Sequence, residues 1–284
     1  MRKKNGIEKL LKMSIIKDKK KLLITLGCSH TEGVGCWIDG TPAELQNKVG
    51  GDEWRYWYRL SHNNFHEKGW PKELGKLMGY DEVLNLGWGG ASASSNVKHW
   101  FETYQEEYFE DYEVTMVWLL PDTSRISFYT KGILTDEMVN GGNNESLLSW
   151  LKKSNDIHLD LELEQSSWIK IMQNECKYKG IRLILFSQDT EIKYLKMLVN
   201  QRIIDSNFLV INTDKRYRSK VCGHLNEKGY KIFAKTLYQK IKSNFRDIDL
   251  GEYNDNIESH WNGERYRIDS KQIINQYNET RKYI

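Results

Sequence analysis

Short apolar runs alternate with amphipathic stretches along most of the chain. The apolar runs have the length of buried strands and lie at 22–26, 83–86, 114–120, 181–186 and 208–212. Helices are predicted at 69–80, from Ser92 or Ser94 to about Phe109, at 161–179, at 190–202 and at 227–242. Strands that alternate with helices are typical of parallel sheets whose two faces are both covered. We therefore expect an α/β protein with a five-stranded parallel sheet.

The pattern also divides the chain into parts. A basic leader covers 1–20, and the α/β domain covers 21–245. Residues 34–68 are aromatic-rich and without periodicity, which predicts an irregular segment. Residues 122–160 also lack periodicity, so we interpret them as an insertion in the domain. Residues 246–284 form a polar and aromatic C-terminal extension whose structure the pattern does not predict.

Composition excludes several classes of protein. The 284 residues include 10 Trp, 16 Tyr and 8 Phe, enough aromatic area to build a core, which argues against a disordered chain. A net charge of +3 is too small for a protein that binds nucleic acid through its phosphates. No apolar run approaches the roughly 18 residues of a membrane span, and no signal peptide is apparent. The four cysteines lack disulfide-framework or zinc-ligand spacing. We expect a cytoplasmic protein, or one incorporated in a virion.

Three motifs at the ends of predicted strands belong together chemically. GCSHTEG (27–33) follows the first strand, NLGWGGAS (85–92) follows the second, and CGHLN (222–226) precedes the last helix. Ser29 can present its hydroxyl at the sheet edge, where backbone N–H groups are available as oxyanion donors. A hydroxyl is a poor nucleophile at neutral pH and needs an imidazole as general base, for which His224 is the candidate. Parallel strands place such sites at their carboxyl ends.

These motifs, in this order, resemble the SGNH (GDSL-type) hydrolases. The resemblance implies a three-layer α/β/α, flavodoxin-like fold and an esterase activity without a cofactor. It implies that Ser29 is the nucleophile, that His224 is the base, and that the N–H groups of Ser29 and Gly90 bind the oxyanion. Residue usage rich in Lys, Asn and Ile, with only 3 Pro, resembles phage-encoded members.

The chain departs from the family pattern at three positions. Pro121 stands where the family has an oxyanion asparagine, and Cys28 stands where it has an aspartate. Cys222 lies near the place of the aspartate that orients the histidine, so Asp214 or a backbone carbonyl is left for that task. Beside these, Arg125 is a candidate for contacting an anionic or sugar group of the substrate, and His30 for lining the pocket.

Two functions of different classes follow. The first is a serine esterase that removes acyl groups such as acetate from a carbohydrate or a small ester, with no cofactor and no metal. The second is a non-catalytic SGNH-shaped module for binding or for a structural role, for example in a viral particle. A nucleotide or flavin binder ranks last, because the chain has no phosphate-cradling loop. The aromatic block 54–58 either stacks on sugars or covers the core, and the second interpretation is the commoner one. Nucleic-acid and membrane partners are not expected, and self-association or virion partners stay open.

Overall fold

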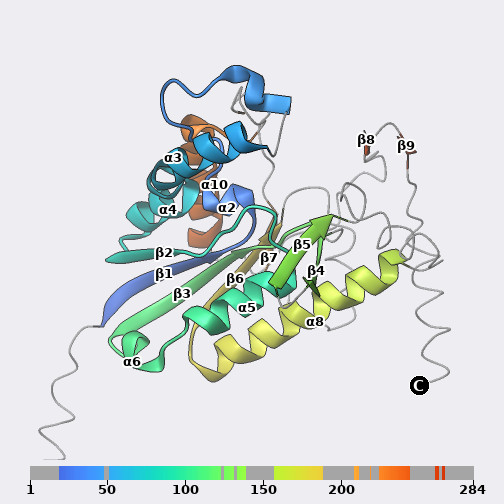
Figure 1. Ribbon diagram of the computed structural model, residues 1–284. Helices are drawn as coiled ribbons and strands as arrows, with labels where there is room; N and C mark the ends of the chain where they lie inside the picture. Colours follow the sequence, from blue (N-terminus) through green and yellow to red (C-terminus); the bar gives the residue numbers. More distant parts are fainter. Residues whose placement is uncertain are drawn as a thin grey trace, which may run out of the picture.

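The protein is described by a computed structural model, which covers residues 19–47, 51–122, 125–130, 133–138, 157–187, 208–210, 218, 224–243, 260–261 and 264–265. Its centre is a parallel sheet with the strand order β2-β1-β3-β6-β7 (Figure 1). The strands are β1 (Lys20–Leu26), β2 (Glu82–Asn85), β3 (Tyr112–Leu119), β6 (Arg182–Ser187) and the three-residue β7 (Phe208–Val210). Apart from one residue or two at the ends, they occupy the predicted apolar runs.

The strand order reverses beside β1. β1 pairs with β2 on one side, with Leu22 opposite Glu82, and with β3 on the other, with Leu22 opposite Val114. Counted along the sheet strands alone, this is the flavodoxin-like order, in which ligands bind at the carboxyl ends beside the reversal. The predicted parallel α/β architecture is confirmed.

Alternate side chains of β1 enter two separate cores. Leu22, Ile24 and Leu26 pack on one face of the sheet against α5 (Ala93–Thr103) and α8 (Ile157–Tyr178). Leu23 packs on the other face with α4 (Trp70–Met78) and α10 (Glu227–Lys242). Figure 1 shows these two helical layers on either side of the sheet. Because both faces are covered, the strands consist of nearly continuous apolar runs rather than alternating ones.

The core beneath α4 and α10 is aromatic. Trp70 lies edge-on to Phe186 with 5.4 Å between ring centroids, and Phe233 of α10 lies 5.8 Å from each of them. The predicted apolar face of α10 is confirmed as buried at Tyr230, Phe233, Leu237 and Ile241. Pro71 occupies the first turn of α4, as expected for a residue without an N–H to donate.

The prediction of an irregular segment at 34–68 is wrong for its second half. Residues Asp52–Lys68 form helix α3, preceded by a 3-10 helix at Ala43–Asn47. Trp54, Tyr58 and Phe65 lie at helical spacing and pack on Trp37. The helical period is hidden because the buried position between them is Ser61, whose hydroxyl accepts a hydrogen bond from the Ile38 N–H at 3.1 Å.

The helix predicted to reach Phe109 is interrupted. Ser92 caps α5 by accepting from the Ser95 N–H at 3.1 Å, and α5 ends at Thr103. Tyr104 is extended, and its ring stacks on Phe109 with 5.0 Å between centroids. The short helix α6 (Glu106–Phe109) follows and leads into β3.

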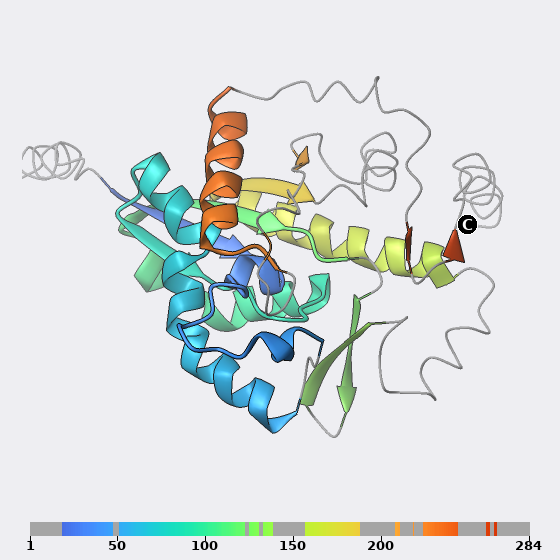
Figure 2. The ribbon, with the colours of Figure 1, turned by 90° about the horizontal axis from the view of Figure 1, so that it is seen from above.

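Within the predicted insertion lies an antiparallel hairpin of β4 (Arg125–Thr130) and β5 (Ile133–Met138). Figures 1 and 2 place this hairpin beyond the carboxyl ends of the sheet strands. Helix α8 begins at Ile157, earlier than predicted. The leader up to residue 18 and the helix predicted at 190–202 lie outside the described residues. Of the C-terminal extension, the structure describes only β8 (His260–Trp261) and β9 (Glu264–Arg265).

Candidate active site

The loops that follow β1 and β2 lie against each other. The Leu86 N–H donates to Thr25 O at 2.8 Å, and the Trp88 N–H donates to Gly27 O at 3.1 Å. These bonds continue the pairing of the two strands past their carboxyl ends. The first two sequence motifs therefore meet at the edge of the sheet, as their positions after neighbouring strands predicted.

Ser29 is the first residue of the four-residue helix α2 (Ser29–Glu32). The chain turns sharply into this helix at Gly27, where φ is +149° and a Cβ would come within 2.2 Å of the Thr31 hydroxyl. Only glycine fits this turn without displacing its neighbours. The Cys28 carbonyl accepts from the N–H groups of Thr31 and Glu32, which closes the helical turn beneath Ser29.

Ser29 and His224 form a hydrogen-bonded pair. The distance from Ser29 Oγ to His224 Nε2 is 2.8 Å, although the two residues are 195 positions apart. Ser29 is 8% exposed and His224 is half-buried. A serine hydroxyl within this distance of an imidazole nitrogen can pass its proton to that nitrogen as it attacks a carbonyl carbon.

The segment that carries His224 is fixed by the loop after α2. At Gly35 a Cβ would lie 2.2 Å from Leu225 O, so the two backbones touch. The Tyr230 hydroxyl donates to Val34 O at 2.7 Å. Asn226 caps α10 by accepting from the Gly229 N–H at 3.0 Å. The position of the imidazole is thus set by backbone packing and by the start of α10.

Gly90 lies in a turn next to Ser29. The Ala91 N–H donates to Trp88 O at 3.1 Å, and Gly90 has a φ of +87°, a conformation that favours glycine. The preceding residue, Gly89, approaches Ser29 so closely that a Cβ at Gly89 would be 4.0 Å from the Ser29 Cβ. The turn therefore brings backbone groups over Ser29, where an oxyanion hole requires donors.

His30 lies beside the pair and not within it. Its ring centroid is 4.7 Å from that of His224. Burial lowers the pKa of His30 well below its ordinary value, and the nearby His224, Arg218 and Arg125 lower it further. A neutral His30 places no positive charge against the neighbouring imidazole of His224.

Arg125 reaches the active-site loop from the hairpin. Its Nη1 donates to Ala91 O at 3.5 Å, while Ser127 of the same strand contacts Ser92 through its hydroxyl. Pro121, which the resemblance sets against an oxyanion asparagine, is buried, and its carbonyl accepts from Gln165 Nε2 at 2.7 Å. That position has a packing role in this chain. Asp214 and Cys222 lie outside the described residues.

Two features of the site escaped the sequence-based prediction. The first is Trp88, which is 64% exposed on the loop between Gly87 and Gly90. An exposed indole at a site edge is unusual, because large aromatic side chains are mostly covered. Its signal in the sequence was a tryptophan set among glycines, which provide no side chains to bury it.

The second feature is a polar cluster between α2 and α3, made of Glu32, Tyr58, His62 and His66. The Tyr58 hydroxyl donates to Glu32 Oε1, and His62 Nε2 lies 3.8 Å from the same oxygen. Burial raises the pKa of Glu32, opposed by hydrogen bonds from the Tyr58 hydroxyl and the Gly89 backbone and by the charge of His62. Burial also lowers the pKa of His66. The sequence signal was the four-residue spacing of the two histidines, which places both on one face of a helix.

No helix in the part of the chain that the structure describes is long and apolar enough to cross a membrane.

No family model and no curated protein matches the sequence. Solved structures do match. A carbohydrate esterase whose active site displays divergent catalytic and non-catalytic binding functions has a TM-score of 0.53 at 12% identity, over 80% of this chain and 70% of that chain. An acetyl xylan esterase from the rumen bacterium Butyrivibrio proteoclasticus has a TM-score of 0.49 at 13% identity, over 80% and 65%.

A family two carbohydrate esterase from Clostridium thermocellum, in complex with cellohexaose, has a TM-score of 0.47 at 13% identity, over 80% and 65% of the two chains. The first match shows the fold: this chain shares the α/β architecture of that carbohydrate esterase, here a parallel sheet with helices on both faces. The matches do not support the phage origin that residue usage suggested.

Proposed function

We propose that the protein is a serine esterase that removes acetyl-like groups from a carbohydrate or another small ester. The observation that carries this proposal is the 2.8 Å hydrogen bond between Ser29 Oγ and His224 Nε2 at the carboxyl end of β1. In this fold, ligands bind at that end of the sheet, beside the reversal of strand order.

The reaction follows from the two side chains and the turn above them. Ser29 Oγ attacks the ester carbonyl carbon while its proton passes to His224 Nε2. The N–H groups of Ser29 and Gly90 stabilise the negative charge on the carbonyl oxygen. His224 then gives the proton to the departing alcohol. A water molecule, deprotonated by His224, attacks the acyl group on Ser29 and releases the acid and the free serine.

A carbohydrate acceptor is supported by Trp88. Its exposed ring stands on the loop that also carries Gly90, and a flat aromatic face suits the apolar face of a sugar ring. The first matched structure is itself a carbohydrate esterase. The aromatic block 54–58 is a weaker candidate for the platform, because Trp54, Trp57 and Tyr58 are only partly exposed and Trp54 and Tyr58 stack on each other.

The alternative, a non-catalytic module, is not favoured. A site kept only for binding would not need Ser29 and His224 within hydrogen-bonding distance of each other, and in this chain they are in contact. The packing of Gly35 against Leu225 also holds the histidine in place before any ligand binds.

The test is hydrolysis of p-nitrophenyl acetate by the full chain and by Ser29→Ala and His224→Ala. Each substitution is expected to lower kcat by about 10⁴-fold or more, and the double variant should be no slower, because the two groups act as one unit. Ser167→Ala, an exposed serine on α8, is the matched control and should keep full activity. A fluorophosphonate probe should label the wild type and not Ser29→Ala. Equal hydrolysis by wild type and Ser29→Ala, or no hydrolysis at all, would remove the proposal.

The carbohydrate assignment has its own test. Trp88→Ala should raise KM for an acetylated oligosaccharide about two- to tenfold, the effect of losing one aromatic stacking contact. KM for p-nitrophenyl acetate should not change, because that ester carries no sugar ring. If KM for both substrates rises equally, Trp88 shapes the site and does not stack on sugars.

A further inference from the structure

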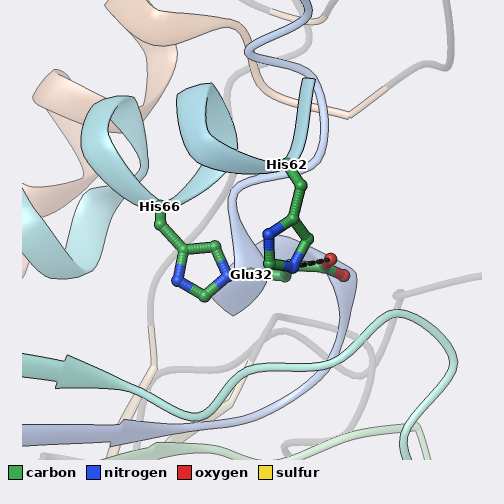
Figure 3. Close-up of side chains that lie close together, drawn as sticks. All are labelled: Glu32, His62 and His66. Carbon is green, nitrogen blue, oxygen red and sulfur yellow. Dashed lines mark ion pairs between the residues drawn. The ribbon is translucent and has the colours of Figure 1, made fainter. Parts of the chain in front are cut away.

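Three side chains that offer metal-ligand atoms meet between α2 and α3. Glu32 ends α2, and His62 and His66 stand one turn apart on α3. Their ligand atoms, one from each residue, all lie within 4.8 Å of one another. Figure 3 shows both imidazole rings hanging from the same side of α3, with the carboxylate of Glu32 close beside them.

The spacing of these atoms is close to that of a metal site. His62 Nε2 is 3.8 Å from Glu32 Oε1. Around a tetrahedral Zn²⁺ with bonds of about 2.0–2.1 Å, neighbouring ligand atoms lie about 3.3 Å apart. Small rotations of the histidine side chains therefore suffice to close the three residues around one ion.

One buried atom of the cluster lacks a hydrogen-bond partner. Among the described residues, His66 Nε2 makes no hydrogen bond, and Glu32 Oε2 has only the nearby Gly89 backbone, which helps to lower the pKa of Glu32. Glu32 is only 3% exposed, so water does not readily compensate its carboxylate. An ion pair between Glu32 and His62 alone would leave His66 Nε2 without a partner. A cation among the three side chains would bind all of them.

We propose that Glu32, His62 and His66 form a binding site for a divalent transition-metal ion, with Zn²⁺ as the best fit. Two imidazoles with one carboxylate form a ligand set that suits Zn²⁺ better than Mg²⁺ or Ca²⁺, which prefer oxygen ligands throughout. The proposal departs from the expectation of a protein without metal, which was drawn from the spacing of the cysteines.

The surroundings supply the other parts of such a site. The Tyr58 hydroxyl holds Glu32 Oε1, as an outer partner commonly orients a ligating carboxylate. The side chain of His62 is 51% exposed, which leaves a path for the ion from solvent. The Gly89 backbone also lies against Glu32, since a Cβ at Gly89 would be 3.1 Å from Glu32 Oε2.

The site joins elements that frame the candidate nucleophile. Glu32 belongs to the same short helix as Ser29, and Gly89 belongs to the loop over Ser29. An ion held by Glu32, His62 and His66 would fasten this helix to α3. Its role is to fix the helix in place, and it takes no part in the proton transfer between Ser29 and His224.

The test uses the full chain after treatment with a chelator. Titration calorimetry with ZnCl₂ should give one ion per chain, lost or weakened at least tenfold in His66→Gln and in Glu32→Gln. Tyr58→Phe should weaken binding by about 10- to 100-fold, the usual cost of losing an outer partner. The control His99→Gln removes a histidine outside the cluster and should bind as the wild type does.

Folding is checked separately, by circular dichroism of each variant without metal. Zn²⁺ should raise the Tm of the wild type and of His99→Gln but not that of His66→Gln. Absence of binding to the wild type would overturn the proposal, and so would binding of unchanged affinity in a folded His66→Gln variant. These outcomes are independent of ester hydrolysis, so they stand whether or not the proposed activity is found.

Discussion

Asn85, the last residue of β2, connects the two loops that frame the candidate active site. Its Oδ1 accepts from the Gly87 N–H at 3.0 Å and from the Thr25 hydroxyl at 3.1 Å. Its Nδ2 donates to Thr31 O at 2.9 Å and lies 3.5 Å from Glu32 O. One side chain thus ties β1, the loop over Ser29 and helix α2 together.

Asn85→Ala removes three well-formed hydrogen bonds and leaves their partners partly buried. A typical hydrogen bond contributes about 0.5–1.5 kcal/mol net, so a loss of about 2–3 kcal/mol in the free energy of unfolding is expected. Asn85→Asp keeps the acceptor oxygen but turns a negative oxygen toward Thr31 O. It should therefore destabilise the protein at neutral pH although its shape is unchanged.

Urea denaturation followed by tryptophan fluorescence measures the effect. Both variants should lower the midpoint without changing the slope, because the surface exposed on unfolding stays the same. Asn63→Ala, which truncates an exposed asparagine on α3, is the matched control and should unfold close to the wild type. If Asn85→Asp is as stable as the wild type, the donor side of Asn85 does not hold α2 in place, and the reasoning fails.

Three further predictions concern parts of the fold away from the site. Gly75→Ala would put a Cβ 2.2 Å from a methyl group of Val83, so it should lower the free energy of unfolding by about 1–3 kcal/mol despite the better helix propensity of alanine. Urea denaturation should show that adding Val83→Ala restores part of this loss. Equal stability of Gly75→Ala and wild type would contradict the packing. Burial raises the pKa of the Cys176 thiol to about 12, so iodoacetamide at pH 8 should label it only after denaturation, as mass spectrometry of the peptide would show. A hydrogen bond from Tyr112 lowers the pKa of Glu82 below its ordinary value of 4.5, so Glu82 contributes stability that is present above that pH and lost as pH falls below it. The difference in urea midpoint between wild type and Glu82→Gln should therefore shrink below about pH 4.5. A difference that stays constant with pH would exclude this contribution of Glu82.

The sheet and its covering helices could be predicted because their burial leaves a direct pattern. Strands covered on both faces consist of nearly continuous apolar residues, as in 114–120, and α10 shows its apolar stripe at helical spacing. The meeting of Ser29 with the loop of Gly90 followed from the rule that parallel strands end at the same edge.

The rest depended on contacts that no local pattern records. Helix α3 was missed because Ser61, and not an apolar residue, fills its central buried position. The cluster of Glu32 with His66 joins two segments that the sequence separates, and the carboxylate gives no sign that it is buried. The packing role of Pro121 depends on Gln165 of α8, whose amide reaches its carbonyl.

The 195 positions between Ser29 and His224 have a consequence for the nascent chain. Chains emerge from the ribosome with their N-terminal parts first. Ser29 has therefore left the ribosome long before His224, whose imidazole would activate it under the proposed mechanism, has been added to the chain. Under the mechanism proposed above, a product cut short before His224 keeps the sequence of β1, β2 and β3 but has no base for its serine. In cell-free synthesis, the moment at which fluorophosphonate labelling begins would consequently show when α10 docks onto the sheet.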